Sequence, residues 1–551
     1  MTQGSARTRA ERHQQWLLRV DSAQRTYGVN AAARLALEAL ADGVEQPALL
    51  NLAASSRYGE GRFEEAVQLL KRARKLAPRD PNVLNSLGLC LNALGRTEEA
   101  LQAYDSALRI EPRMAIAHFN RGVALEEINE VNRARSAYEQ TVALEPNHVE
   151  ALASIAWLDA QTGSFDSARS YADRALARSP TSVLARMALA AVDLARNDLK
   201  AAGPRLSALL NGPPLAPVNR SIVLGLIGDF NDAVGNPGEA FAAYDASNSE
   251  LKAFYTGHFD ARGQESALAH VRLLTAWFEA ANRESWSTAA AARPRAADPK
   301  AHIFLVGFPR SGTTLLENVL AAHPDVVSLE EKDSLAVADA TYLSSREGLE
   351  RLARITPGEA MRQREIYWSA VGKCGVEPRD RVFIDKMPLA SVQLPVIAKL
   401  FPDARVLFAV RDPRDVVLSC FRRRFGMNPS MYQLLTLEGA AAFYDAVMRL
   451  SELYHDRLPL ARHVVRYEDL VEDLEGTGRA ACDFIGLDWN EDMLDFAAKA
   501  RSRGIATPSA SQVARGLNRE GEGVWRRYRE QMAPVLPLLE PWAQRFGYAS
   551  E

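Results

Sequence analysis

Residues 307–314, Gly-Phe-Pro-Arg-Ser-Gly-Thr-Thr, contain two glycines, one arginine and three residues with hydroxyl side chains. Backbone N–H groups of such a loop and the N-terminus of a following helix bind phosphate-like anions. The nucleoside-triphosphate loop reads GxxxxGK[ST], in which the lysine reaches the β- and γ-phosphates. Here Gly307 and Gly312 keep that spacing, but Thr313 replaces the lysine and the positive charge comes earlier, so a phosphosulfate fits better than a triphosphate. The expected contacts are Arg310, Ser311, Gly312, Thr313 and Thr314.

A strand and a helix must hold this loop in place. His302–Val306 is a continuous apolar run, short enough for a strand buried on both faces. Apolar residues from Leu315 to Ala321 recur at helical spacing until Pro324 ends the helix. Strand, glycine loop and helix in this order predict an anion-binding loop rather than a simple turn.

The loop and the residues after it resemble a known family. Phe308–Thr314 resembles the 5′-phosphosulfate loop of sulfotransferases, and the continuation through Leu320–Glu331 is similar, without a gap, to the tyrosylprotein sulfotransferase branch. The resemblance spans most of residues 302–551. It implies an α/β P-loop domain of three layers with a parallel sheet. It also implies transfer of a sulfuryl group from 3′-phosphoadenosine 5′-phosphosulfate to an acceptor hydroxyl, with no metal.

The donor's 3′-phosphate requires a second binding site. Another buried-strand run, Ala404–Val410, ends in Arg411, and Ser419 follows in a helix that begins near Pro413. Arg411 and Ser419 resemble the family's 3′-phosphate site, and Arg423 lies one helical turn beyond Ser419, so we expect it to bind the same phosphate. Its two neighbours are expected on a solvated helix face: Arg422 and Arg424.

Sulfuryl transfer is an in-line displacement that needs a base for the acceptor proton and a cation for the leaving oxygen. By resemblance Glu331 is the base, with its neighbour Glu330 as the alternative, and His323 ranks below both as a helix-end residue. Lys386 resembles the family's strand-end lysine and supplies the cation, together with Arg310 of the loop.

A kinase would instead use Asp385 as a metal ligand after the apolar strand, but that interpretation needs the missing loop lysine. Three further positions belong to the nucleotide side by resemblance. Tyr467 either contacts the donor or packs in the core, Ser509 aligns with a donor-contacting serine, and Arg515 is a candidate for the charge expected near Trp525.

The N-terminal half contains a repeat of 34 residues over about 47–195. Its register is marked by the alanines Ala66, Ala100, Ala134 and Ala168 and by the prolines Pro78, Pro112, Pro146 and Pro180. The period and pattern resemble the tetratricopeptide repeat, a helix pair that buries its apolar face by stacking on neighbours. Degenerate units are expected at residues 10–45 and 235–246.

These patterns predict an all-α tetratricopeptide solenoid over residues 1–283, a linker over 284–300 and the α/β domain over 301–551. The array either holds a protein or peptide in its groove or serves only as a scaffold. The acceptor is expected to be a protein or peptide tyrosine. A carbohydrate or small-molecule acceptor, and a scaffold whose domain binds nucleotide without turnover, are the alternatives.

The composition is that of an ordinary globular protein, with 47% apolar and 25% charged residues. Sixty-six Lys and Arg against 69 Asp and Glu give a net charge of −3, so neither nucleic acid nor membrane is an expected partner. The four cysteines are scattered, which suggests neither a disulfide framework nor a zinc site. The first residues lack the apolar core of a signal peptide, so we expect a cytoplasmic protein.

Overall fold

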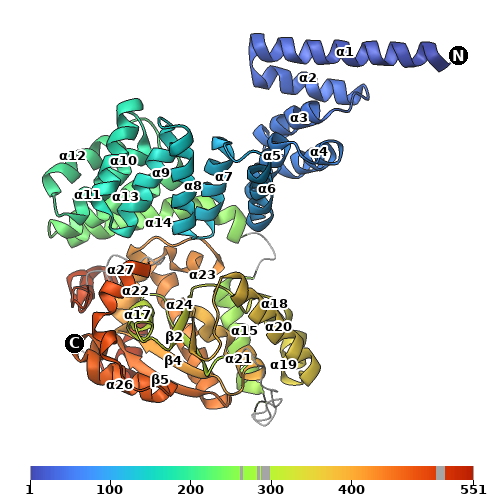
Figure 1. Cartoon of the computed structure of the whole chain (residues 1–551). Coiled ribbons are helices and arrows are strands. Elements are labelled where there is room, and N and C mark those ends of the chain that lie inside the picture. Colours follow the sequence, from blue (N-terminus) through green and yellow to red (C-terminus); the bar gives the residue numbers. More distant parts are fainter. Residues whose placement is uncertain (1, 261–264, 282–285, 287–297, 504–515, 550–551) are drawn as a thin grey trace. The chain divides into compact units, whose positions relative to one another are not determined.

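The computed structural model describes residues 2–260, 265–281, 286, 298–503 and 516–549 (Figure 1). Contacts divide the chain into two compact units, and the main division falls inside α11 (Val183–Ala195). The N-terminal unit comprises residues 1–160 and 164–189. The C-terminal unit comprises residues 190–551 together with residues 161–163.

The N-terminal unit is a stack of helical hairpins, as the repeat predicts. The second helix of each of four repeats ends two residues before the repeated proline, which cannot continue a helix. The helices are α1 (Thr2–Tyr27), α2 (Val29–Ala41), α3 (Pro47–Gly59), α4 (Phe63–Leu76), α5 (Pro81–Ala93), α6 (Thr97–Ile110), α7 (Ala115–Glu127), α8 (Val131–Leu144), α9 (Val149–Thr162) and α10 (Phe165–Arg178).

A glycine in the first helix of a repeat allows a tyrosine of the second helix to approach. A Cβ at Gly88 would lie 2.5 Å from the ring of Tyr104, and one at Gly122 would lie 2.6 Å from the ring of Tyr138. Both tyrosines are buried, so these positions require the smallest residue. These two glycines, which lie one repeat apart, therefore mark close helix contacts.

The same packing recurs in the C-terminal unit. Its first helices are α12 (Leu199–Leu210), α13 (Pro217–Ala233), α14 (Pro237–Phe259) and α15 (Ala267–Ala280). A Cβ at Gly228 of α13 would overlap the ring of Tyr244 in α14, with the same sequence spacing as in the clear repeats. The degenerate unit expected around residues 235–246 is thus a repeat-like hairpin, which we call the α13–α14 hairpin.

A five-stranded sheet lies at the centre of the C-terminal unit. Its strands are β1 (Ala301–Gly307), β2 (Val326–Glu330), β3 (Val382–Lys386), β4 (Arg405–Val410) and β5 (Ala461–Arg466). They are ordered β2-β3-β1-β4-β5, and every pair is parallel. Leu305 of β1 is in register with Lys386 of β3 and with Leu407 of β4. The predicted parallel sheet is confirmed.

Helices cover both faces of the sheet, which confirms the three layers. Ile303 and Leu305 pack with α17, α26 and α27, whereas Phe304 and Val306 pack with α20, α21, α22 and α24. The elements are α17 (Thr313–Leu320), α18 (Ala336–Tyr342), α19 (Arg346–Ala353), α20 (Pro357–Lys373), η1 (Pro388–Gln393), α21 (Leu394–Leu400), α22 (Pro413–Arg422), α23 (Pro429–Tyr432), η2 (Gln433–Leu435), α24 (Leu437–Arg457), α25 (Tyr467–Glu472), α26 (Leu474–Ile485), η3 (Glu491–Asp495), α27 (Phe496–Arg503), η4 (Val524–Tyr528), α29 (Arg529–Met532) and α30 (Leu536–Arg545).

The last helices before the sheet share its hydrophobic core. Tyr244 of α14, Leu274 and Phe278 of α15, and Trp286 are buried in the same cluster as α22 and α24. The ring centroids of Phe278 and Tyr454 lie 4.8 Å apart. The division by contacts lies inside α11, and most of the linker predicted at residues 284–300 lies outside the described residues. Helical periodicity alone does not show which neighbour a helix packs against.

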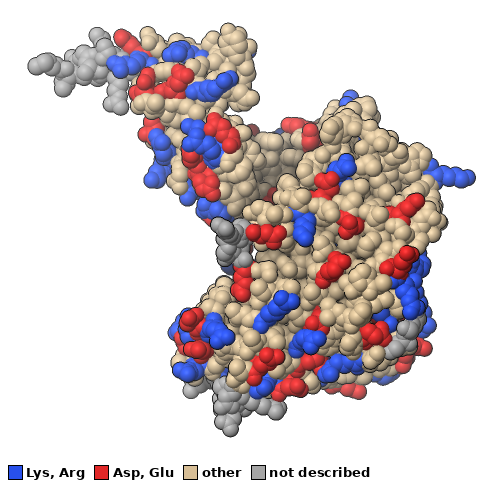
Figure 2. Space-filling view, turned by 180° about the vertical axis from the view of Figure 1, so that it is seen from behind, with Lys and Arg blue, Asp and Glu red and all other residues tan. Residues whose placement is uncertain are grey.

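The described helices and one face of the surface bear on whether the chain has a membrane-spanning segment. Within the described ranges, no helix is both long and apolar enough to cross a bilayer. On the face shown in Figure 2, acidic and basic side chains are interspersed, in keeping with the small net charge.

We expect residues 190–551 to fold as one cooperative unit and residues 296–551 to be unable to fold stably. The shorter fragment loses Tyr244, Leu274 and Phe278 from the core, and their burial contributes about 5–9 kcal/mol. That loss is comparable with the total stability of an ordinary domain. Thermal unfolding followed by near-ultraviolet circular dichroism checks this. A sharp transition in residues 296–551 would contradict it.

Candidate active site

The sequence-predicted site residues gather at one edge of the sheet. Because all strands are parallel, their carboxyl ends lie together, and open α/β sheets bind ligands at this edge where the strand order reverses. Here β1 lies between β3 and β4 and leads into the loop 308–312. At the other strand ends or directly after them stand Glu331 (β2), Lys386 (β3), Arg411 (β4) and Tyr467 (β5).

The loop after β1 has an unusual backbone at two positions. Gly312 adopts φ 92° as the N-cap of α17, and a Cβ there would lie 2.8 Å from the ring of Tyr467. Arg310 adopts φ 70°, in the left-handed region that non-glycine residues rarely enter. Such conformations concentrate at functional sites. The first N–H groups of α17 have no partner within the helix and face the end of this loop.

Three arginines form a positive cluster beside the loop. Nε of Arg310 donates to Oγ of Ser419 at 3.1 Å, and Nη1 of Arg411 donates to the carbonyl of Arg310 at 3.2 Å. Burial, together with the charges of Arg423 and Arg411, lowers the pKa of Arg310 to about 10. Nε of Arg411 is buried without a hydrogen-bond partner among the described residues. A bound anion would satisfy this atom and relieve the repulsion, so the cluster fits a phosphate group.

A cavity opens between the loop and the residues after β4 and β5. The predicted Tyr467 is part of its wall, with its ring 4.9 Å from the guanidinium carbon of Arg411. Its lining residues are Arg310, Gly312, Thr313, Thr314, Leu315, Arg411, Tyr467, Gly516, Leu517, Asn518 and Gly521. The structure therefore brings together most of the residues predicted to contact the donor. The buried Ser311 belongs to the same loop but not to this lining.

Arg423 and Arg422 differ from the sequence expectation. Arg423 lies just past the end of α22 in extended backbone, and its Nη1 is 3.7 Å from Oδ2 of Asp229. Arg422 was expected in solvent, but its side chain is 13% exposed and its Nη2 lies 2.5 Å from Oδ2 of Asp232. The solvated-face prediction for Arg422 was wrong because α13 packs against this end of α22.

A fully buried lysine lies at the end of β3. Nζ of Lys386 is 2.8 Å from Oε1 of Glu331 and 3.5 Å from Oε1 of Glu330. Glu331 also has left-handed backbone, with φ 47°, and its N–H donates to the carbonyl of Lys386 at 2.8 Å. The predicted base and the predicted cation are thus in direct contact, and the alternative base Glu330 is slightly farther away.

Glu317 is a third carboxylate at this lysine and was not predicted. Its Oε2 lies 3.3 Å from Nζ of Lys386, and both side chains are buried. Burial raises the pKa of Glu317 to about 7, although the charge of Lys386 acts to lower it. A glutamate within an otherwise apolar helix turn, Leu315-Leu316-Glu317, is the only sequence signal for it.

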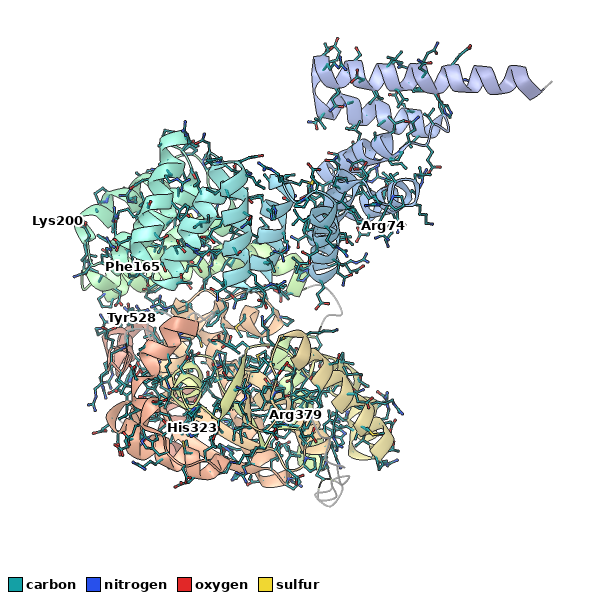
Figure 3. The ribbon with its side chains drawn as sticks, viewed as in Figure 1. Arg74, Phe165, Lys200, His323, Arg379 and Tyr528 are labelled. Carbon is teal, nitrogen blue, oxygen red and sulfur yellow. The ribbon has the colours of Figure 1, made fainter. Side chains whose placement is uncertain are left out.

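Two residues weighed in the sequence lie away from this centre. Asp385 accepts a hydrogen bond from the hydroxyl of Tyr367 at 2.8 Å, and that hydroxyl also contacts His302. Adjacent strand residues point to opposite faces, so Asp385 belongs to the side opposite Lys386. His323, labelled in Figure 3, accepts from the N–H of Asp325 at Nδ1 and holds the turn after α17.

The predicted nucleotide side falls only in part on described residues. Trp525 is buried under Arg414. The backbone N–H groups of Trp525 and Gly523 both donate to the carboxylate of Asp415, at 2.9 Å and 2.7 Å. Ser509 and Arg515 lie outside the described residues. Over the ranges that are described, no three His, Cys, Asp or Glu side chains are grouped as a metal site would need.

Comparison with known proteins gives one family for each unit. Residues 302–491 match the model of the Sulfotransferase family, and segments between residues 17 and 183 match the tetratricopeptide repeat. The chain is 30% identical over 268 residues to protein-tyrosine sulfotransferase 2 of Gallus gallus, covering 45% of this chain and 69% of that protein. It is 28% identical over 264 residues to protein-tyrosine sulfotransferase 1 of Danio rerio, covering 45% and 72%.

An uncharacterized protein of Aquifex aeolicus is 28% identical over 255 residues, which cover 44% of this chain. The chain spans about a third of the length of that relative, 32%.

We expect Glu317→Gln to change how stability depends on pH. Glu317 keeps its proton up to about pH 7 in the folded protein, against an ordinary pKa of 4.5. Between about pH 4.5 and 7 the folded state therefore binds more protons than the unfolded state. The contribution of Glu317 to the free energy of unfolding falls as pH rises through this range. Glutamine has no such titration, so the stability of the wild type relative to the variant should fall by about 1–3 kcal/mol between these values.

Urea unfolding of both proteins at about pH 5 and pH 8 measures this difference. Lys386 remains charged throughout, because neighbouring carboxylates raise its pKa against the effect of burial. A stability difference that does not change with pH would contradict the assignment.

Proposed function

Because the chain belongs to the sulfotransferase family, we propose that it transfers a sulfuryl group from 3′-phosphoadenosine 5′-phosphosulfate to the phenol of a protein or peptide tyrosine. The observation that carries the proposal is the contact of Glu331 with Lys386 at the sheet edge that also holds the arginine cluster. A base, a cation and an anion-binding loop are the three parts that such a transfer requires.

In the proposed reaction, the phenol oxygen forms a bond to the donor sulfur while the bond from sulfur to the bridging phosphate oxygen breaks. The phenol proton passes to Glu331, and adenosine 3′,5′-bisphosphate leaves. A phenol has a pKa near 10, so a carboxylate removes its proton only as the new bond forms. The protein's task is therefore to position the partners and to stabilise the charge that develops on the leaving oxygen.

Lys386 and Arg310 are the residues proposed to stabilise that charge. In the free protein, the ammonium of Lys386 contacts the carboxyl groups of Glu317, Glu330 and Glu331. An anionic donor competes with these carboxylates for the ammonium, which would free Glu331 for the acceptor. The 5′-phosphosulfate is assigned to the loop 310–314, and the 3′-phosphate to Arg411, Ser419 and Arg423.

The choice of donor is supported by the charge and composition of the cavity. Thr313 stands where a triphosphate-binding loop needs lysine. The buried Nε of Arg411, which has no hydrogen-bond partner among the residues that the structure describes, supports an anion on the side of β4. These features favour two separated anionic groups over one triphosphate with Mg²⁺.

The choice of a protein acceptor rests on the named relatives and on the helical array. Two of the relatives are protein-tyrosine sulfotransferases, and tetratricopeptide arrays present concave binding surfaces. A carbohydrate or small-molecule acceptor would leave the array without a role in delivery.

Glu331→Gln should abolish most turnover while leaving donor binding intact. Loss of a general base lowers the rate about 10²- to 10⁴-fold. We expect kcat to fall by that factor in an assay with labelled donor and tyrosine peptides, and the affinity for adenosine 3′,5′-bisphosphate not to fall.

The matched control is Glu330→Gln, which removes the more distant carboxylate and should reduce kcat much less. If Glu330→Gln is the inactive variant, the two roles are exchanged. A strict Mg²⁺ requirement or a preference for ATP over adenosine 3′,5′-bisphosphate would refute the proposed donor.

Removal of the N-terminal unit should raise KM for protein acceptors and leave short tyrosine peptides unaffected. The reason is that an array that delivers a protein contributes binding energy only to substrates large enough to reach it. Labelling of a cell lysate by the full chain and by residues 190–551 checks this. Equal labelling of proteins by both forms would show that the array does not deliver the substrate.

A further inference from the structure

We propose that the α13–α14 hairpin positions the 3′-phosphate side of the donor site, with Asp232 as its central positioning residue. The inference rests on the proposed function, since it concerns the same donor. It gives the final repeat-like hairpin a role in the chemistry of the α/β domain, in addition to any role in binding partners.

Asp232 joins two segments that are far apart in the sequence. One carboxylate oxygen lies 2.5 Å from Nη2 of Arg422 at the end of α22. The other accepts from the hydroxyl of Tyr528 at 2.7 Å and lies 3.0 Å from Nη1 of Arg527, both in η4. Tyr528, labelled in Figure 3, is buried. One side chain of α13 therefore holds α22 and η4 together.

The carboxylate of Asp232 is kept charged by these partners. Its own burial acts to raise its pKa, but Arg422, Tyr528 and Arg527 together hold the pKa below the ordinary value. The guanidinium of Arg422 is also placed between two aromatic rings, with its carbon 5.1 Å from the centroids of both Tyr244 and Tyr528. Arg422 is thus fixed by charge and by packing.

The end of α22 receives two further contacts from α14. The rings of Phe241 and Phe421 stack with centroids 4.9 Å apart. Nδ2 of Asn248 donates to the carbonyl of Phe421 at 2.9 Å, in a buried position. This carbonyl lies in the last turn of α22, where no intrahelical donor remains. Phe421 and Arg422 are therefore both held by the hairpin.

The segments that the hairpin holds are those that approach the donor cavity. Ser419 lies on α22 and accepts from Arg310, and Arg423 follows the end of α22 next to Asp229 of α13. On the other side, η4 continues from the cavity-lining residues 516–521. Displacing Arg422 would move Ser419 and Arg423 relative to Arg310. This movement should weaken the contacts with the 3′-phosphate and leave the loop 310–314 in place.

The test compares two ligands that differ only in the 3′-phosphate, adenosine 3′,5′-bisphosphate and adenosine 5′-monophosphate. Their affinities for the full chain and for Asp232→Asn are measured by calorimetry. We expect the affinity ratio of the two ligands to fall about tenfold in the variant, the size of one charge-assisted hydrogen bond. Partial unfolding lowers both apparent affinities by the same factor, so the ratio does not respond to a loss of stability alone.

Tyr528→Phe removes one hydrogen bond to Asp232 and should lower the ratio about threefold, a smaller effect in a milder variant. Asp105→Asn is the matched control, because Asp105 makes an exposed ion pair with Arg121 in the N-terminal unit and should leave the ratio unchanged. An unchanged ratio in Asp232→Asn, with clear discrimination by the wild type, would overturn the inference. A wild type that does not distinguish the two ligands would instead overturn the proposed donor.

Discussion

The buried ammonium of Lys386 determines much of the arrangement around it. An isolated charge in a protein interior is strongly unfavourable, so Lys386 requires carboxylates that approach from several directions. Glu317 comes from α17, and Glu330 and Glu331 come from the end of β2. These contacts tie the helix of the anion-binding loop to the two neighbouring strands. The same ammonium is the group that the proposed chemistry needs, so the fold and the reaction depend on one interaction.

A second constraint is the repulsion between positive charges at the end of β4, along the same edge of the sheet. The arginines near β4 are positive groups in close proximity, and they are held in place by acceptor side chains and backbone carbonyls. Arg411 contacts the carbonyls of Arg310 and Gly521, and Arg422 contacts Asp232. The protein thus builds a local positive field within a chain of nearly zero net charge. Such a field favours the binding of an anionic group at this place.

The fold could be predicted from the sequence, and the candidate site residues could be named, because their signals are local. An apolar run followed by a glycine loop specifies a strand end, and parallel strands bring such ends together whatever the connections between them. Glu317 was missed because its partner Lys386 is distant in the sequence, and an isolated glutamate in a helix is usually solvated. The burial of Arg422 was missed for the same reason, since it depends on α13. The extent of the C-terminal unit also depends on this packing, which periodicity does not encode.

The left-handed backbone at Arg310 and Glu331 lowers the stability of the protein at two positions whose side chains the proposed activity requires. A side chain in this region destabilises the native state by about 1 kcal/mol or more, and glycine or asparagine would relieve most of that strain. Neither replacement carries the charge that the proposed reaction requires. Selection for heat resistance alone would therefore favour substitutions that remove function at these two positions. Retention of arginine and glutamate in a thermally stabilised homologue would be a sign that its activity is under selection.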